Sequence, residues 1–165
     1  FGLLGGYTAT YGSYSSAAAS FVTPYVLGTS MAGVDAATLP QSRLIVLWGA
    51  NIADNRLGCE MEAAIRDAKA RGTPVIVLDP RRSRTVRQLG TEWIPVQPGT
   101  DSALMMAVLY IWLQEGMVDL PFVARHSVGF PELQRHVLGE DGTPPKTPAW
   151  GAAIRLWPRS HSLSA

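Results

Sequence analysis

Cysteine, histidine and charged side chains are all scarce in this chain of 165 residues. The single cysteine, Cys59, excludes an intrachain disulfide and any metal site built from several cysteines of this chain. The three histidines, His126, His136 and His161, lack the spacing of a metal site. Charged residues make up 16% and the net charge is +1, so the sequence has no strongly basic face and we expect no nucleic-acid partner.

No apolar run is long enough to cross a bilayer, which takes ~20 residues. The longest run, 103–113, is better interpreted as a buried helix. Neither an initiator methionine nor a charged leader precedes Phe1, and we expect the chain to be a piece of a larger protein. Hydrophobic residues make up 47% of the chain, which is enough for a sizeable core in about one domain.

Short apolar runs alternate with a helical pattern from residue 43 onward. Residues 43–48 and 75–78 have the continuous aliphatic composition of buried strands, and 93–96 form a third, shorter one. Between the first two, apolar residues recur at helical spacing from Met61 to Ala68, which marks one face of an amphipathic helix. This order predicts a βαβ unit and an α/β fold: a Rossmann-like parallel sheet with helices on both faces.

Three further helices are predicted outside that unit. One spans Ala17 to about Val26 and ends near Gly28. Another starts with Asp101 as its N-cap, runs to about Glu115, and is apolar nearly all round, so we expect it deep in a core. Asp119 caps a third. The chain then divides into a Gly/Ser-rich segment with a short helix, an α/β region and a tail without pattern, at 1–42, 43–154 and 155–165.

Polar residues follow each of the three predicted strands. The loops are 49–55, 79–81 and 98–101. Because the carboxyl ends of parallel strands share one edge of a sheet, and nucleotides bind outside that edge, the sequence predicts three candidate binding loops side by side.

Asp79 ends the second strand, where a carboxylate accepts hydrogen bonds from ribose hydroxyls in dinucleotide folds. The alternative is an Asx-turn before Pro80.

The first loop has a glycine only at Gly49, which departs from the Gly-x-Gly-x-x-Gly pattern and disfavours an NAD(P)-binding module. The amides of Asn51 and Asn55 are candidate ligand contacts, and an ordinary strand-to-helix connection is the alternative.

The third loop, 98–101, ends in Asp101 at a helix start, where free N–H groups favour anions. The carboxylate of Asp101 is also an acceptor suited to the paired N–H donors of a guanine edge. The alternative is a plain N-cap worth ~1 kcal/mol.

Near the beginning of the chain, Ser15 lies in a Gly/Tyr/Ser-rich stretch that has no hydrolase motif. Its composition alone is typical of a flexible linker.

In combination these motifs resemble the molybdopterin oxidoreductases of the dimethyl sulfoxide reductase family. The resemblance covers about residues 3–154 and rests on the order and spacing of five segments: Tyr14-Ser15-Ser16, Leu-Trp-Gly-Ala-Asn at 47–51, Val-Leu-Asp-Pro-Arg at 77–81, Trp-Ile-Pro-Val-Gln-Pro-Gly-Thr-Asp-Ser-Ala-Leu at 93–104, and Glu-Gly-Met-Val-Asp at 115–119. The stretch 11–16 is most similar to the catalytic subunits of the anaerobic dimethyl sulfoxide reductases.

The resemblance implies a Mo-bis(molybdopterin guanine dinucleotide) cofactor and a fragment of a larger multidomain enzyme. Ser15 matches the serine that ligates molybdenum, which implies reduction of S-oxides or N-oxides by oxygen-atom transfer. One guanine dinucleotide is assigned by resemblance to Asp54, Asn55, Leu78, Asp79, Gly99, Thr100 and Asp101, and Asn51 and Arg81 of the same loops complete the candidate cofactor-binding residues.

The resemblance extends to partners and location. It implies an iron–sulfur electron-transfer subunit, a membrane anchor subunit and a periplasmic or membrane-associated enzyme, and it allows a [4Fe-4S] cluster in a part of the enzyme that precedes this chain. Two alternatives stay open at this point. One is a non-catalytic electron-transfer subunit of the same family, and the other is an NAD(P)-binding Rossmann module.

Overall fold

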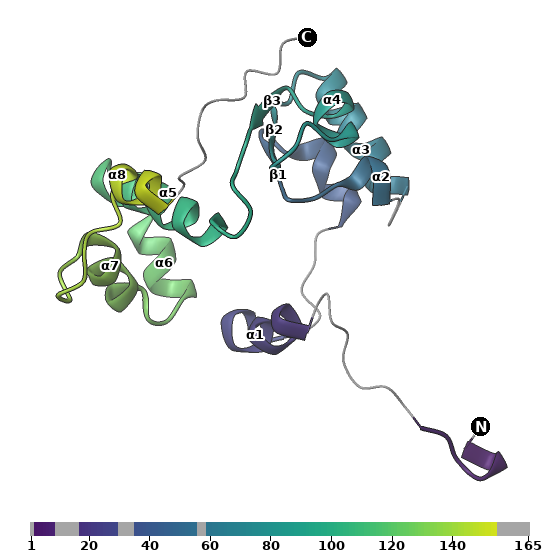
Figure 1. Ribbon diagram of the computed structural model, residues 1–165, viewed down its shortest axis with the longest axis horizontal. Coiled ribbons are helices and arrows are strands. Elements are labelled where there is room, and N and C mark those ends of the chain that lie inside the picture. The colour runs from purple at the N-terminus through teal and green to yellow at the C-terminus, as the bar shows by residue number, and fades with distance from the viewer. Residues whose placement is uncertain (1, 9–16, 30–34, 56–58, 155–165) are drawn as a thin grey trace.

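The computed structural model describes residues 2–8, 17–29, 35–55 and 59–154 (Figure 1). Ser15 and the tail 155–165 lie outside the described residues. The elements, in chain order, are η1 (Gly2–Leu4), α1 (Ala17–Leu27), η2 (Ala36–Gln41), β1 (Ile45–Trp48), α2 (Ile52–Asn55), α3 (Cys59–Ala70), β2 (Val75–Leu78), α4 (Arg84–Gln88), β3 (Glu92–Ile94), α5 (Asp101–Gln114), α6 (Leu120–His126), α7 (Phe130–Leu138) and α8 (Pro148–Ile154).

The three strands form one parallel sheet in the order β1-β2-β3. Ile45 is in register with Val75, and Val77 is in register with Trp93. Helix α3 connects β1 to β2, and α4 connects β2 to β3. The predicted α/β class and parallel sheet are therefore confirmed, with each strand within two residues of its predicted bounds.

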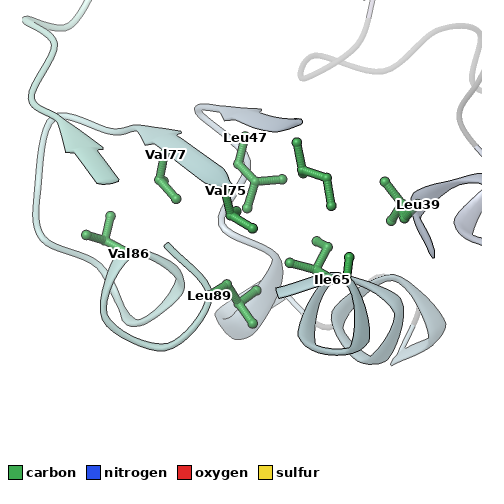
Figure 2. Close-up of a cluster of buried hydrophobic side chains, with 9 residues drawn as sticks. Leu39, Leu47, Ile65, Val75, Val77, Val86 and Leu89 are labelled. Carbon is green, nitrogen blue, oxygen red and sulfur yellow. The ribbon is translucent and has the colours of Figure 1, made fainter. Parts of the chain in front are cut away.

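The core of the sheet lies on one face (Figure 2). Successive side chains of a strand point to opposite faces, so Leu47, Val75 and Val77 share a face. There they meet Ile65 of α3 and Leu89, which follows α4, as Figure 2 shows. Full burial of an aliphatic side chain contributes about 1.5–3 kcal/mol, so this cluster holds the strands in place on the helices.

The other face of the sheet is covered only in part in the described part of the chain, with Leu78 buried on it. Val46, which alternates with the core residues of β1, is 47% exposed. Helices α3 and α4 both lie on the face of Val75 and Val77 (Figure 2), and the described residues do not supply the helical cover expected on the second face.

Helices α5 to α8 form a second group, in which α5 contacts α7 and α8. The prediction that α5 lies deep in a core was wrong for this chain. Only Ala103 and Ala107 of α5 are buried, and Trp112 is 50% exposed. The physical reason is that α7 and α8 cover one side of a helix that is apolar on all sides.

One predicted helix and the start of another are confirmed, and one predicted cap is wrong. Helix α1 covers the predicted segment, and Asp119 caps α6 by accepting a hydrogen bond of 2.9 Å from the amide of Phe122. Asp101 is not the N-cap of α5. It is the first helical residue, and the cap is Thr100, which makes no side-chain capping bond.

Four short helices, α2, α4, α7 and α8, were not predicted. The start of α4 has a recognisable signal, because the side chain of Ser83 accepts from the amide of Val86. The start of α7 has another, since Pro131 occupies its first turn. None of the helices in the described ranges is long and apolar enough to cross a membrane.

Candidate functional site

The loops after the three strands begin side by side at the carboxyl edge of the sheet. Trp48 and Leu78, the last residues of β1 and β2, are in register. The amide of Gly49 donates to the carbonyl of Leu78 at 2.8 Å, and the amide of Asp79 donates to the carbonyl of Ile94 at 3.3 Å. The edge predicted for nucleotide binding is thus a continuous row of strand ends.

The third loop enters α5 through a tight turn. The amide of Thr100 donates to the carbonyl of Gln97 at 3.2 Å, and Gly99 has a φ of +80°. A left-handed glycine at the third position is what a type II turn requires, and proline is common at the second. The hydroxyl of Thr100 also donates to the Gln97 carbonyl, at 2.8 Å, so Thr100 is occupied in holding the turn.

Asp101 is attached to the sheet by its side chain. Its Oδ1 accepts a hydrogen bond of 2.7 Å from Nε1 of Trp48. Within the described residues no donor is found for its Oδ2. The amide oxygen Oε1 of Gln97, four residues earlier, is buried and has no partner there either. Since buried acceptors are nearly always paired, the turn and the helix start hold unused acceptor capacity.

Asp79 is only 5% exposed and is already hydrogen-bonded through both oxygens. Oδ1 accepts from the amide of Arg81 at 2.9 Å, and Oδ2 accepts from the hydroxyl of Ser83 at 3.0 Å. The first of these bonds makes the Asx-turn that the sequence offered as the alternative. Each carboxylate oxygen has a second lone pair, so acceptor capacity remains.

The two carboxylates approach the edge from different faces of the sheet. Asp79 is bonded to Ser83, the N-cap of α4, on the helix-covered side. Asp101 is bonded to Trp48, which alternates with the core residue Leu47 and so belongs to the opposite face. A ligand that contacts both side chains has to lie across the carboxyl edge.

Asn51 is bonded to Asp54 and to α4. The amide nitrogen of Asn51 donates to Oδ2 of Asp54 at 2.9 Å, and its oxygen accepts from the hydroxyl of Thr85 at 2.7 Å. Thr85 is fully buried and accepts in turn from the amide of Ala53 at 3.0 Å. This network fixes the first loop against α4.

The remaining predicted residues differ in accessibility. Asn55, Arg81 and Gly99 are exposed, and Leu78 is buried in β2.

Two residues of the site, Trp48 and Gln97, were not predicted from the sequence. Gln97 had a weak signal, its place before Pro98, whereas the partner of Trp48 lies 53 residues away and had none. Across the described ranges, no group of three or more His, Cys, Asp or Glu side chains is placed to hold a metal ion.

Comparison with known proteins assigns the chain to a family. The family model described as molybdopterin oxidoreductase matches residues 1–150. Dimethyl sulfoxide reductase DmsA of Haemophilus influenzae is 38% identical over 92% of the chain and 21% of its own length. The dimethyl sulfoxide/trimethylamine N-oxide reductase of Rhodobacter capsulatus is 31% identical over 92% of the chain and 20% of its own length.

A solved structure agrees with these relatives. Acetylene hydratase from Pelobacter acetylenicus superposes with a TM-score of 0.52 and 28% identity, over 68% of this chain and 14% of that one. The chain spans about a fifth of the length of the curated relatives it matches. The α/β architecture, the family match over residues 1–150 and the relatives agree, and this chain belongs to the molybdopterin oxidoreductase family.

Proposed function

We propose that this chain is the part of a molybdenum-dependent S-oxide or N-oxide reductase that binds one guanosine end of Mo-bis(molybdopterin guanine dinucleotide). Family membership supports a molybdopterin cofactor. Relatives named as reductases of dimethyl sulfoxide and of trimethylamine N-oxide support the substrate class. The observation that carries the guanosine contact is the carboxylate of Asp101, which is held at the strand edge with Oδ2 unpaired among the described residues.

The donor and acceptor chemistry of the edge fits a guanine. Its Watson–Crick edge presents N1–H and N2–H₂ as adjacent donors, and the unpaired oxygen of Asp101 is an acceptor. Gln97 adds a buried, unpartnered acceptor on the preceding turn. Gly49 and Gly99 have open space where a Cβ would stand, so a ligand has room to approach the backbone of both loops.

The ribose and the phosphates would be held by the neighbouring loop. Asp79 would accept from the ribose hydroxyls through the lone pairs that Arg81 and Ser83 leave free. The exposed guanidinium of Arg81 is suited to the pyrophosphate. Asn55 lies on the first loop with an exposed side chain. Because Asp79 and Asp101 approach from different faces, we infer that the nucleoside lies across the edge with its ribose and base on opposite sides.

The reaction is assigned to the cofactor and the binding to the protein. When bound, the molybdenum pterin supplies the two-electron chemistry that removes oxygen from the oxide. This chain orients it through the guanosine contacts, and Ser15, outside the described residues, is proposed as the metal's protein ligand. The comparisons support this function over an NAD(P)-binding module or a non-catalytic subunit, because the named relatives are reductases.

The partner subunits and the location of the enzyme are part of the same proposal. An electron-transfer subunit that carries iron–sulfur clusters, a membrane anchor subunit, and a periplasmic or membrane-associated location fit the DmsA relatives. A [4Fe-4S] cluster in another part of the same polypeptide is also proposed. These features are testable by purification of the native complex and by iron analysis.

The decisive experiment removes the Asp101 carboxylate in the full-length enzyme. Asp101→Ala should reduce the guanine nucleotide retained per chain by about tenfold or more, because loss of a charge-assisted hydrogen-bond acceptor costs over 1.4 kcal/mol, or about one factor of ten. The nucleotide is measured after acid release, and Ser102→Ala, at the exposed next position, serves as the control. Full retention in Asp101→Ala would contradict the guanosine contact.

The metal-ligand assignment has its own test. Ser15→Ala should change the electron paramagnetic resonance spectrum of the molybdenum while the guanine nucleotide content stays near that of the wild type, because the two contacts lie in separate segments. An unchanged spectrum and unchanged oxide reduction would refute the role of Ser15.

A further inference from the structure

The side chain of Trp48, at the end of a strand, forms a hydrogen bond to the first residue of a distant helix. It is half-buried, it alternates with the core residue Leu47, and its indole points away from the core face. Its Nε1 donates to Oδ1 of Asp101 over 2.7 Å, which is the length typical of an N–H bond to a charged acceptor. One hydrogen bond thus joins the end of β1 to the start of α5.

Within the described residues, this bond is what sets the orientation of the Asp101 carboxylate. Asp101 does not cap α5, since the N-cap is Thr100. The terminal torsion of an aspartate is broad and has no strong preference of its own. An aspartate at this position without a donor would rotate freely, and a guanine would have to immobilise it on binding, at a cost in entropy.

We propose that Trp48 is a positioning residue for guanine recognition. By holding Oδ1, it aims Oδ2 and the second lone pair of Oδ1 at the site where the paired N–H donors of a guanine arrive. The inference rests on the proposed function and adds to it the residue that makes the carboxylate selective. An indole that only joined the sheet to α5 would stabilise the fold and would not affect which base is bound.

The variants separate these two roles in the full-length enzyme. Trp48→Phe keeps an aromatic ring and removes the donor. Trp112→Phe, on the exposed part of α5, is the matched control for loss of an indole. Asp101→Asn keeps an oxygen that accepts from Trp48 and replaces the other oxygen with a donor, so the positioning bond survives and the guanine contact does not.

Two measurements are made on each variant. The first is the rate at which the purified enzyme loses guanine nucleotide during dialysis. The second is titration of cofactor-free, full-length protein with GDP and with IDP, whose hypoxanthine base lacks the 2-amino group of guanine. The ratio of the two affinities reports how well the carboxylate is aimed, and a general loss of stability leaves that ratio unchanged.

We expect the wild type and Trp112→Phe to prefer GDP over IDP by about tenfold, the lower end for a bidentate base contact. Trp48→Phe should lose nucleotide several-fold faster and should retain little of this preference. Asp101→Asn should show no preference at all.

Each other outcome has a distinct meaning. A Trp48→Phe variant with the wild-type ratio, or with equal weakening toward GDP and IDP, would overturn the positioning role and leave the proposed function standing. A wild type with no preference, or with no binding of either nucleotide, would overturn the guanine contact and the inference with it.

Discussion

The sheet region, residues 35–96, and the helical region, residues 101–154, use similar apolar residues but bury them differently. In the sheet region, Ile65, Val75, Val77 and Leu89 are fully buried between strands and helices. In the helical region, Trp112, Met117 and Phe122 are each at least half exposed. The first region is two facing layers, whereas α5 is covered on one side only.

This difference bears on the candidate site. The strand ends and the turns that carry Asp79 and Asn51 stand on a core that the described residues complete by themselves. Asp101 belongs to the less buried region and reaches the same edge through its bond to Trp48. A precise site therefore depends on a well-packed sheet, on the turn 97–100 that leads into α5, and on the bond between Trp48 and Asp101.

The largest expected effect is a cavity in the sheet core. Ile65→Ala should lower the free energy of unfolding of the sheet region by about 2–5 kcal/mol, because Ile65 is fully buried in the cluster that contains the core residues of β1 and β2. Hydrogen exchange of the β1 and β2 amides in the full-length enzyme measures this loss. Met105→Ala, on the exposed part of α5, should leave those amides unchanged, and equal effects of the two changes would remove the contrast between the regions.

Substitution of one glycine in each region tests how tightly that region is packed. A Cβ at Gly90 would lie 2.8 Å from the carbonyl oxygen of Val86 and 3.1 Å from Cγ2 of Val77, so Gly90→Ala should destabilise by about 1–3 kcal/mol. A Cβ at Gly151 of α8 would lie 3.0 Å from Cβ of Ala107. There the helix propensity of alanine offsets the crowding by up to about 1 kcal/mol.

Gly151→Ala should therefore be close to neutral. Thermal unfolding of the two variants gives the comparison directly. A larger loss for Gly151→Ala than for Gly90→Ala would show that the α5–α8 contact is more rigid than the sheet.

The smallest effect expected is a dependence on pH in the helical region. The hydroxyl of Thr143, the ring of His136 and the amide of Thr143 all bond to the Asp141 carboxylate and hold its pKa well below the ordinary value of 3.8. A carboxyl group with a lowered folded pKa stabilises the fold above its unfolded pKa, and this contribution disappears as the pH falls through the folded value.

Asp141→Asn should accordingly speed hydrogen exchange in α7 at about pH 5, and its difference from the wild type should shrink as the pH falls from there toward about pH 2. The effect is modest, because Asp141 is exposed and solvent screens its interactions. A difference that grows between about pH 5 and about pH 2 would contradict the sign of this shift.

Local patterns in the sequence predicted the sheet, and long-range contacts explain what they missed. The strands and α3 were recognisable because their apolar residues follow the period of one buried face. Helix α4 has only five residues, too few to show a period. The cap of α5 was misplaced by one residue, since the type II turn ends on Thr100.

The candidate site divides in the same way. The three loops follow from strand order, and Asp79 was recognisable because it directly follows a strand. The hydrogen bonds of each side chain could not be predicted, because they depend on partners distant in sequence. These partners are Thr85 for Asn51 and Trp48 for Asp101. The burial of Oε1 of Gln97 likewise results from tertiary packing and leaves no local pattern.

A crystal structure of the full-length enzyme with its cofactor bound tests the central claim most directly. The account predicts guanine N1 and N2 within about 3 Å of the Asp101 carboxylate, with Nε1 of Trp48 still bonded to Oδ1. A guanine seated away from the carboxyl edge of β1 and β2, with Asp101 contacting only protein, would contradict it.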